Sequence, residues 1–309
     1  MLTAIIDLGT NTFHLLIADI KGKGGFEKIY RDRKVVKLLQ GREVSNLIEE
    51  IPFQRGIQAG RIFSEKIKKY GVEKIVAYAT SGIRTASNGE FFLSALKAET
   101  GIGATIISGD EEAEFIYFGV KQSINLGQEN SLILDIGGGS NELIIANNER
   151  ISWKNSFNLG AARMLSKFAP SDPILTAEIS AIENFFEEEL KLLFEALKLF
   201  PCSVLIGCSG SFDTFAEMTT HKFGNPEQLF GKKEFDFNLE HYFSIHQWLV
   251  NSTQTERMQM KGLVKMRVDM IVIASIFTRL IIEKVGIKKM RLSRGALKEG
   301  ILWKISNFE

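Results

Sequence analysis

Short apolar runs alternate with longer stretches of helical periodicity along the first half of the chain. The apolar runs predict strands at Leu2–Asp7, Phe13–Asp19, Phe26–Val35, Lys74–Thr80 and Ala104–Ser108. The helical stretches are Glu43–Glu49, Pro52–Tyr70 and Glu90–Glu99. A capping-box pattern begins at Ser108 and predicts a further helix over Gly109–Val120. This alternation favours an α/β fold in which helices cover a mixed sheet.

The polar stretch Lys121–Asn130 separates this half from a second one, in which the apolar runs begin again. The second half predicts a strand hairpin at Leu132–Ala146 and strands at Ser203–Ile206 and Lys289–Leu292. Helices are expected at Thr176–Leu199, Leu239–Asn251, Arg267–Val285 and from about Ala296 onward. The segment Phe223–Phe237 is irregular enough to predict a loop. We therefore expect two domains that meet near residue 125.

One pattern occurs twice and aligns without a gap, over Ile5–Ala18 and Ile133–Ala146. Each copy has an apolar run ending in aspartate, a glycine-rich turn with a hydroxyl residue, and a second apolar run. A single hairpin of this kind is often only a turn, but two matching copies favour a duplicated fold with two phosphate-binding turns, because successive backbone amides can point at an anion. The residues expected to bind phosphate there are Gly9, Thr10, Asn11 and Thr12 in the first turn and Gly137, Gly138, Gly139, Ser140 and Asn141 in the second.

The two aspartates of the repeat are candidate ligands for a divalent cation. Asp7 and Asp135 end matching strands, where a carboxylate can reach a Mg²⁺ ion that bridges to phosphate oxygens. His14 in the first copy corresponds to Glu142 in the second, so Asp135 and Glu142 flank one turn and can converge. Asp135 could instead brace the turn, and Glu142 could be a solvated strand residue. We expect His14 to be packed or hydrogen-bonded, and four histidines give little support for a histidine-rich metal site.

Three further charged residues could take part in chemistry. Glu112 lies in the first turn of the helix predicted after Ser108, where acids also simply favour the positive end of the helix dipole. If its face points into a cleft, Glu112 can take a proton from an attacking water. Arg84 follows a strand on a turn and could grip phosphate with two parallel bonds, or lie at the surface. Arg267 offers a basic rim, with a solvated helix face as the alternative.

Bulk composition argues against several partners. The net charge is +1, from 38 basic and 37 acidic residues, which gives no case for a nucleic-acid or membrane partner. The two cysteines fit reduced, buried side chains rather than a disulfide framework. The first residues do not have the pattern of a signal peptide, and the longest apolar stretch is too short for a membrane span. We expect a cytoplasmic protein.

Several segments resemble the exopolyphosphatase and guanosine-pentaphosphate phosphohydrolase (Ppx/GppA) family. They are DLGTNTFHL from Asp7, ATSGIRTASN from Ala79, SGDEEAEFIYFGV from Ser108, DIGGGSNEL from Asp135, SFNLGAARM from Ser156, GCSGSFDTF from Gly207 and MKGLVKMRVDMI from Met260. The resemblance implies the actin-like ATPase (ribonuclease H-like, ASKHA) fold, with two related α/β domains over about 1–125 and 126–294 and the active site in the cleft between them. It also implies that a final helix, over about 295–309, can return to the first domain.

The resemblance implies a Mg²⁺-dependent (or other divalent-cation-dependent) hydrolase that releases terminal phosphate from inorganic polyphosphate, guanosine pentaphosphate or both. Glu112 matches the family's general base, Asp135 and Glu142 match its metal carboxylates, and the turns and Arg84 match its phosphate-binding positions. A homodimer is expected by family analogy. Lys298 stands where arginine is common, and the extra helical domains of the longest members are not expected here. An ATP-dependent kinase of the same fold, with a nucleoside pocket near Gly207–Ser211, and a non-catalytic guanosine tetra/pentaphosphate sensor remain alternatives.

Overall fold

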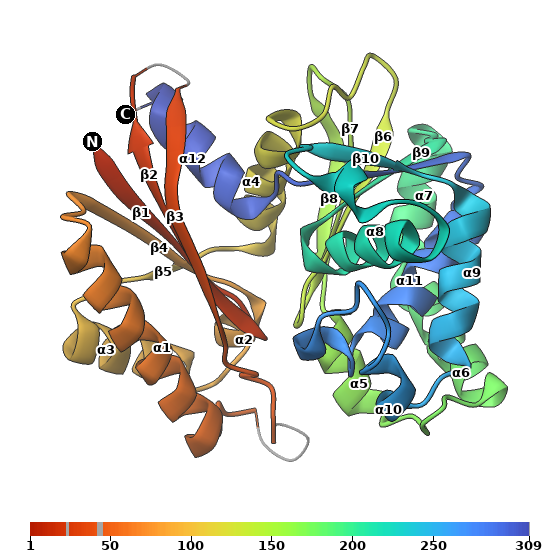
Figure 1. Ribbon diagram of the computed structural model, residues 1–309, viewed down its shortest axis with the longest axis horizontal. Coiled ribbons are helices and arrows are strands. Elements are labelled where there is room, and N and C mark those ends of the chain that lie inside the picture. The colour runs from red at the N-terminus through yellow and green to blue at the C-terminus, as the bar shows by residue number, and fades with distance from the viewer. Residues whose placement is uncertain (23–24, 42–45, 309) are drawn as a thin grey trace.

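The computed structural model describes residues 1–22, 25–41 and 46–308 and contains two sheets (Figure 1). The first sheet has the order β3-β2-β1-β4-β5. Its strands are β1 (Leu2–Leu8), β2 (Thr12–Ile20), β3 (Phe26–Val35), β4 (Lys74–Ala79) and β5 (Thr105–Ile106). β1 pairs antiparallel with β2 and parallel with β4, so the sheet is mixed, as predicted.

The second sheet repeats this arrangement, with the order β10-β11-β9-β6-β7-β8. Its strands are β6 (Ser131–Ile136), β7 (Asn141–Ala146), β8 (Ile151–Phe157), β9 (Val204–Cys208), β10 (Glu234–Phe237) and β11 (Lys289–Ser293). β6, β7, β8, β9 and β11 therefore correspond to β1, β2, β3, β4 and β5, and β10 is added at the edge. The fold is duplicated and has the actin-like architecture.

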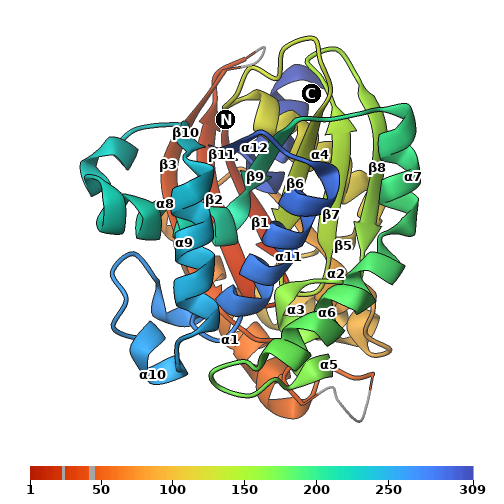
Figure 2. The same cartoon turned by 90° about the vertical axis from the view of Figure 1, so that its right-hand side faces the viewer.

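Helices fill three layers around the sheets, as Figures 1 and 2 show. The outer face of the first sheet packs against α1 (Glu50–Lys69) and α3 (Gly89–Thr100), and the short α2 (Ser81–Arg84) follows β4. Between the sheets lie α4 (Gly109–Lys121) and α12 (Leu297–Phe308). The helices of the second half are α5 (Ala161–Phe168), α6 (Thr176–Glu189), α7 (Lys191–Leu199), α8 (Ser209–Phe223), α9 (Leu239–Val250), α10 (Gln254–Arg257) and α11 (Ile271–Val285).

Strand alternation decides which residues face the middle layer. In β1, Ile6 packs in the outer core and Ile5 in the core shared with α4 and α12. In β6, Leu134 likewise packs in the outer core of its own half and Ile133 in the core shared with α4 and α12. Because successive side chains point to opposite faces, the aspartate that follows each inner isoleucine by two positions also faces the middle of the molecule.

Glycines allow α4 and α12 to cross at very close range. A methyl group on Gly119 would lie 1.9 Å from the Ala296 carbonyl oxygen, and one on Gly300 would lie 1.7 Å from the Phe115 carbonyl oxygen. Only glycine fits at these two positions, since a Cβ atom cannot approach backbone so closely. The crossing joins the C-terminal helix to the first half, and Lys28 of β3 donates to Glu299 of α12 at 2.6 Å.

Several sequence-based predictions are wrong in detail. The helix expected over Thr176–Leu199 is two helices, because the backbone breaks at Leu190. The segment expected as a loop contains a 3-10 turn, η1 (Pro226–Leu229), and β10. α11 begins at Ile271, and Arg267 instead ends a 3-10 turn, η2 (Lys265–Arg267). Of the helix expected over Glu43–Glu49, residues 43–45 lie outside the described residues and 46–49 are not helical.

No helix in the described part of the chain combines the length and apolar character needed to span a bilayer.

Candidate active site

A cavity of about 610 Å³ lies between the two halves and is lined by both glycine-rich turns. The turns face each other directly. A methyl group on Gly138 would lie 3.1 Å from Asn11 Cβ and 3.2 Å from Thr10 Cβ, and one on Gly139 would lie 2.5 Å from Thr10 Oγ1. The close approach of the two backbones explains why glycine occupies these positions.

In both turns the backbone carbonyl groups are bonded to neighbouring segments. In the first turn, the amide of Leu38 donates to the Thr10 carbonyl at 2.8 Å, and the amide of Val36 donates to the Asn11 carbonyl at 2.9 Å. In the second, the amide of Ala161 donates to the Gly137 carbonyl at 2.9 Å. Engaging these carbonyls elsewhere reduces their repulsion of an anion and suits turns that bind phosphate through amides.

Acidic residues sit at matching points beside each turn. Asp135 lies directly across the β6–β7 pair from Glu142, and Asp7 lies across β1–β2 from His14. Asp135 and Glu142 are almost fully buried, with 6% and 2% of their surface exposed. Burial, and then the charge of Asp135, raises the pKa of Glu142, while burial raises the pKa of Asp7 to about 6. Buried carboxylates that repel one another favour a bound cation.

Glu112 projects from the first turn of α4 into the same cavity. The helix begins with the predicted capping box between Ser108 and Glu111, which leaves the next residue, Glu112, on the inner face. Arg84 Nη1 donates to Glu112 Oε2 at 2.9 Å and to the carbonyl oxygen of Ile107 at 2.9 Å. Burial and the charge of Glu142 outweigh Arg84 and raise the pKa of Glu112 well above its ordinary value of 4.5. A carboxyl with a raised pKa is suited to proton transfer near neutral pH.

Hydroxyl groups that the sequence analysis did not single out orient the two carboxylates of the second half. Ser209 Oγ donates to Asp135 Oδ2 at 2.6 Å, and Ser156 Oγ donates to Glu142 Oε1 at 2.7 Å. Ser209 has a positive φ of 63°, which is strained for a residue with a side chain. Its position directly after β9, within the glycine-containing segment Gly207–Ser211, was the available sequence signal.

Basic residues also line the cavity. Its lining includes the cations Arg31, Arg33, Arg267, Arg294 and Lys298. Burial lowers the pKa of Arg267 to about 10, which leaves its guanidinium charged at neutral pH. Burial, together with the charges of Lys298, Arg267 and Arg33, lowers the pKa of His14 well below 6.5, so this imidazole is neutral.

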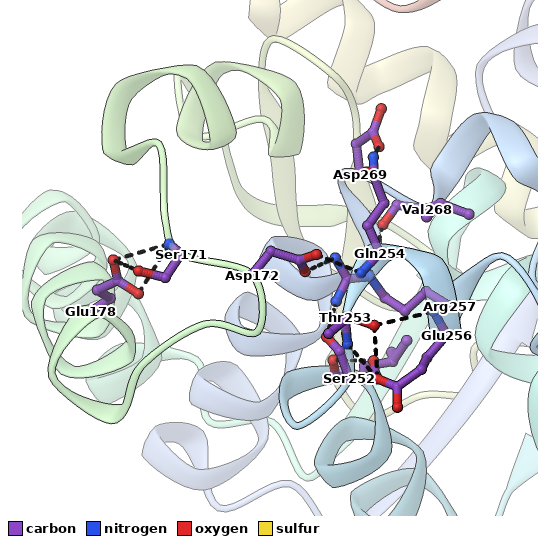
Figure 3. A network of polar contacts seen from close by, with 11 residues as sticks. Ser171, Asp172, Glu178, Ser252, Thr253, Gln254, Glu256, Arg257, Val268 and Asp269 are labelled. Atoms are coloured by element: carbon purple, nitrogen blue, oxygen red, sulfur yellow. Dashed lines mark hydrogen bonds and ion pairs between the residues drawn. The ribbon is translucent and has the colours of Figure 1, made fainter.

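The segment that carries Arg267 is anchored by a buried arginine, as Figure 3 shows. Arg257 donates through Nε to the Val268 carbonyl at 3.2 Å and through Nη2 to Asp172 Oδ1 at 2.8 Å. Gln254 Nε2 donates to Asp269 Oδ1 at 2.5 Å. The other oxygen of Asp269 pairs with Lys37 of the first half at 3.2 Å, so this segment contacts both halves.

The cavity brings together most of the residues that the sequence singled out. Its lining includes Asp7, Gly9, Thr10, Asn11, Thr12, Glu112, Asp135, Gly137, Gly138, Gly139, Ser140, Glu142 and Arg267. Arg84 is not part of the lining and donates to Glu112, which is, so its expected direct contact with phosphate stays a prediction. Asn141 is also outside the lining, because its buried amide donates to the Leu159 carbonyl at 3.0 Å.

The acidic residues suit a cation held jointly with a substrate. Within residues 1–22, 25–41 and 46–308, no three His, Cys, Asp or Glu side chains form a cage for a metal ion. Mg²⁺ commonly binds through one or two carboxylates together with substrate phosphates and water. Asp135 and Glu142 are buried, adjacent and hydrogen-bonded by serines, and they fit this kind of site.

Comparison with known proteins agrees with this architecture. A model of the Ppx/GppA phosphatase family matches residues 16–308. The crystal structure of an exopolyphosphatase from Cytophaga hutchinsonii superposes with a TM-score of 0.94 at 32% identity, over 99% of this chain and 98% of that one. An exopolyphosphatase-like protein has a TM-score of 0.88 at 22% identity, over 98% of this chain and 97% of that one. The Ppx/GppA family member of Aquifex aeolicus has a TM-score of 0.79 at 23% identity, over 99% and 97%.

Proposed function

Because the chain belongs to the Ppx/GppA phosphatase family, we propose that it hydrolyses the terminal phosphoanhydride bond of inorganic polyphosphate, guanosine pentaphosphate or both. The observation that carries this proposal is the direct approach of the two glycine-rich turns over one cavity. Gly138 and Gly139 lie against Thr10 and Asn11, so one phosphoryl group can contact both turns. Amide groups from two sides suit the equatorial oxygens of that group, where charge is spread in the transition state.

Glu112 is the proposed general base. Its carboxylate takes a proton from a water molecule, whose oxygen attacks the terminal phosphorus. The anhydride bond to the leaving oxygen then breaks, and the electron pair leaves with the shortened chain. Arg84 holds Glu112 from behind at 2.9 Å and keeps its carboxyl oriented toward the cavity.

Asp135 and Glu142, with Asp7 nearby, are the proposed holders of Mg²⁺ or another divalent cation. Such an ion neutralises charge on phosphate oxygens when bound. Ser209 and Ser156 fix the two carboxylates of the second half, so their orientation does not depend on the substrate.

The basic residues of the cavity are proposed to receive the rest of the substrate. A cavity of about 610 Å³ falls in the range of small-molecule sites and is larger than one phosphate group requires. Arg31 and Arg33 lie on β3 of the first half, and Arg267 and Arg294 lie on the second. Cations from both halves suit a linear polyanion that extends through the cavity.

A phosphate-release assay tests the proposal. The purified chain is incubated with short polyphosphate, long polyphosphate, guanosine pentaphosphate or ATP, with Mg²⁺ or with a chelator, and without any phosphate acceptor. We expect release of orthophosphate from the polyphosphates or guanosine pentaphosphate, and loss of this activity with the chelator.

Other outcomes would favour the alternatives. Tight binding of guanosine tetraphosphate in calorimetry, without turnover of any substrate, would indicate a sensor. Phosphate transfer that requires ATP and an added acceptor would indicate a kinase and would refute the proposed hydrolysis.

A further inference from the structure

Helix α5 holds three successive carbonyl groups of the second glycine-rich turn. The amide of Ala161 donates to the Gly137 carbonyl at 2.9 Å, and the amides of Ala162 and Arg163 both donate to the Gly138 carbonyl at 3.0 Å. The third carbonyl, that of Gly139, accepts from the side chain of Arg163, whose Nε lies at 2.9 Å.

The first turn shows what this side chain replaces. Asn11 corresponds to Gly139 in the repeat, and its carbonyl accepts two backbone amides, from Val36 at 2.9 Å and Lys37 at 3.2 Å. The second turn instead uses the guanidinium of Arg163. The Arg163 side chain therefore holds, in the second half, the carbonyl that two backbone amides hold in the first.

The other end of Arg163 reaches the opposite half of the molecule. Its Nη2 donates at 3.0 Å to Thr85 Oγ1, which follows α2 in the first half. Thr85 is next to Arg84, whose Nη1 donates to Glu112. A short series of contacts thus connects the second phosphate turn with the proposed base.

We infer that Arg163 is a positioning residue that fixes the amides of the second turn and sets their placement relative to Glu112 when the halves are together. This inference rests on the proposed function for its catalytic consequence only. The orientation of the turn also affects binding of inorganic phosphate, which can be measured without turnover.

The test compares Arg163→Met, Arg163→Lys and a matched control, Lys167→Met. Lys167 is an exposed cation one turn further along α5 and contacts the ring of Phe185, so its removal changes charge without touching the turn. We expect Arg163→Met to weaken binding of inorganic phosphate and to lower kcat/KM about 10- to 100-fold, the range for loss of a charged hydrogen bond. Arg163→Lys should recover only part of this, because an ammonium group cannot reproduce both guanidinium contacts. Lys167→Met should behave as the wild type.

Two further measurements separate positioning from simple loss of stability. Added guanidinium should partly restore the activity of Arg163→Ala at concentrations that do not alter its thermal midpoint. Thr85→Val should cause a smaller loss, and combining it with Arg163→Met should add nothing further.

Wild-type phosphate binding and kcat/KM in folded Arg163→Met would overturn the inference while leaving the proposed function intact. If Arg163→Met does not fold, folded Arg163→Lys with wild-type values and no response to guanidinium in Arg163→Ala would overturn it. If the wild type hydrolyses none of the substrates, the proposed function fails, and phosphate binding alone decides the role of Arg163.

Discussion

Replacing Glu112 by glutamine tests the proposed chemistry with the least structural change. Glutamine has the same shape as glutamate and keeps an oxygen that can accept from Arg84 Nη1, the contact now made at 2.9 Å. It cannot accept a proton from water. The two turns, the carboxylates of the second half and the basic residues of the cavity all remain, so Glu112→Gln should remove only general-base catalysis.

The expected magnitude follows from that single loss. A positioned general base contributes about 10²- to 10⁴-fold in rate, which corresponds to about 3–5 kcal/mol of activation free energy. We expect kcat to fall by this factor, with little change in KM. Because burial raises the pKa of Glu112 above 4.5, the wild-type rate should also decline on acidification at a higher pH than an ordinary glutamate would give. The variant should lack that decline.

Glu111→Gln is the matched control for this substitution. Glu111 lies one position earlier, is exposed, and accepts from the Ser108 amide at 2.8 Å in the capping box. Glutamine can serve in the same cap, so turnover should be unchanged. Phosphate release measured from pH 5 to 9 for the three proteins decides the matter. Wild-type turnover in Glu112→Gln, or an equal loss in Glu111→Gln, would refute the assignment of Glu112 as the base.

Three other outcomes are expected. Asp7→Asn should raise the free energy of unfolding of the metal-free protein by up to about 3 kcal/mol above pH 6. The reason is that the pKa of Asp7 is about 6 in the folded protein and near 3.8 in the unfolded one, so folding keeps an unfavourable charge that asparagine lacks. Denaturant titrations should show this gain disappearing as the pH falls from 6 to 4. Gly139→Ala should force the turns apart and lower kcat/KM at least several-fold, since the new methyl would lie 2.5 Å from Thr10 Oγ1. Gly103→Ala, whose new methyl would lie 3.8 Å from the Lys97 side chain, should keep wild-type kinetics. Lys37→Met removes a half-exposed ion pair with Asp269 between the halves, and chemical denaturation should show the free energy of unfolding falling by less than about 1 kcal/mol.

Apolar periodicity was enough to predict the elements that pack on two faces. β1 and β6 appear where expected because each has apolar side chains at strand spacing, and the helix beginning at Gly109 appears where the capping box predicted it. β8 was missed because six of its seven residues are only partly buried and its sequence mixes polar and apolar side chains. The break at Leu190 has no glycine or proline to announce it, and the fully buried side chain of Leu190 indicates that packing determines it.

The candidate site also has a part that the sequence predicts and a part that it does not. Residues within the repeated motif could be predicted to converge, since a duplicated fold brings matching strand ends together. The direction in which a long side chain points could not be predicted from the sequence. Arg84 donates to Glu112 and does not line the cavity. Arg163 donates to the Gly139 carbonyl, and this contact depends on how α5 packs against the second turn. A lone arginine in a short helix carries no sequence signal for such a contact.

The duplication also explains why the two halves contribute different groups to one cavity. α4 follows β5 and α12 follows β11, which occupy equivalent places in the two sheets. The first turns of the two helices match, because Glu111 accepts from the Ser108 amide at 2.8 Å and Glu299 accepts from the Ala296 amide at 3.1 Å. Glu112 follows the first of these acids and Gly300 follows the second, so α12 has no acid at the position of the proposed base. At the matching strands, the neutral side chain of His14 stands where the second copy has the acidic Glu142. Equivalent backbone positions thus supply two similar turns, while unlike side chains at matching positions put the proposed base, Glu112, only in the first half and Glu142, a proposed cation ligand, only in the second.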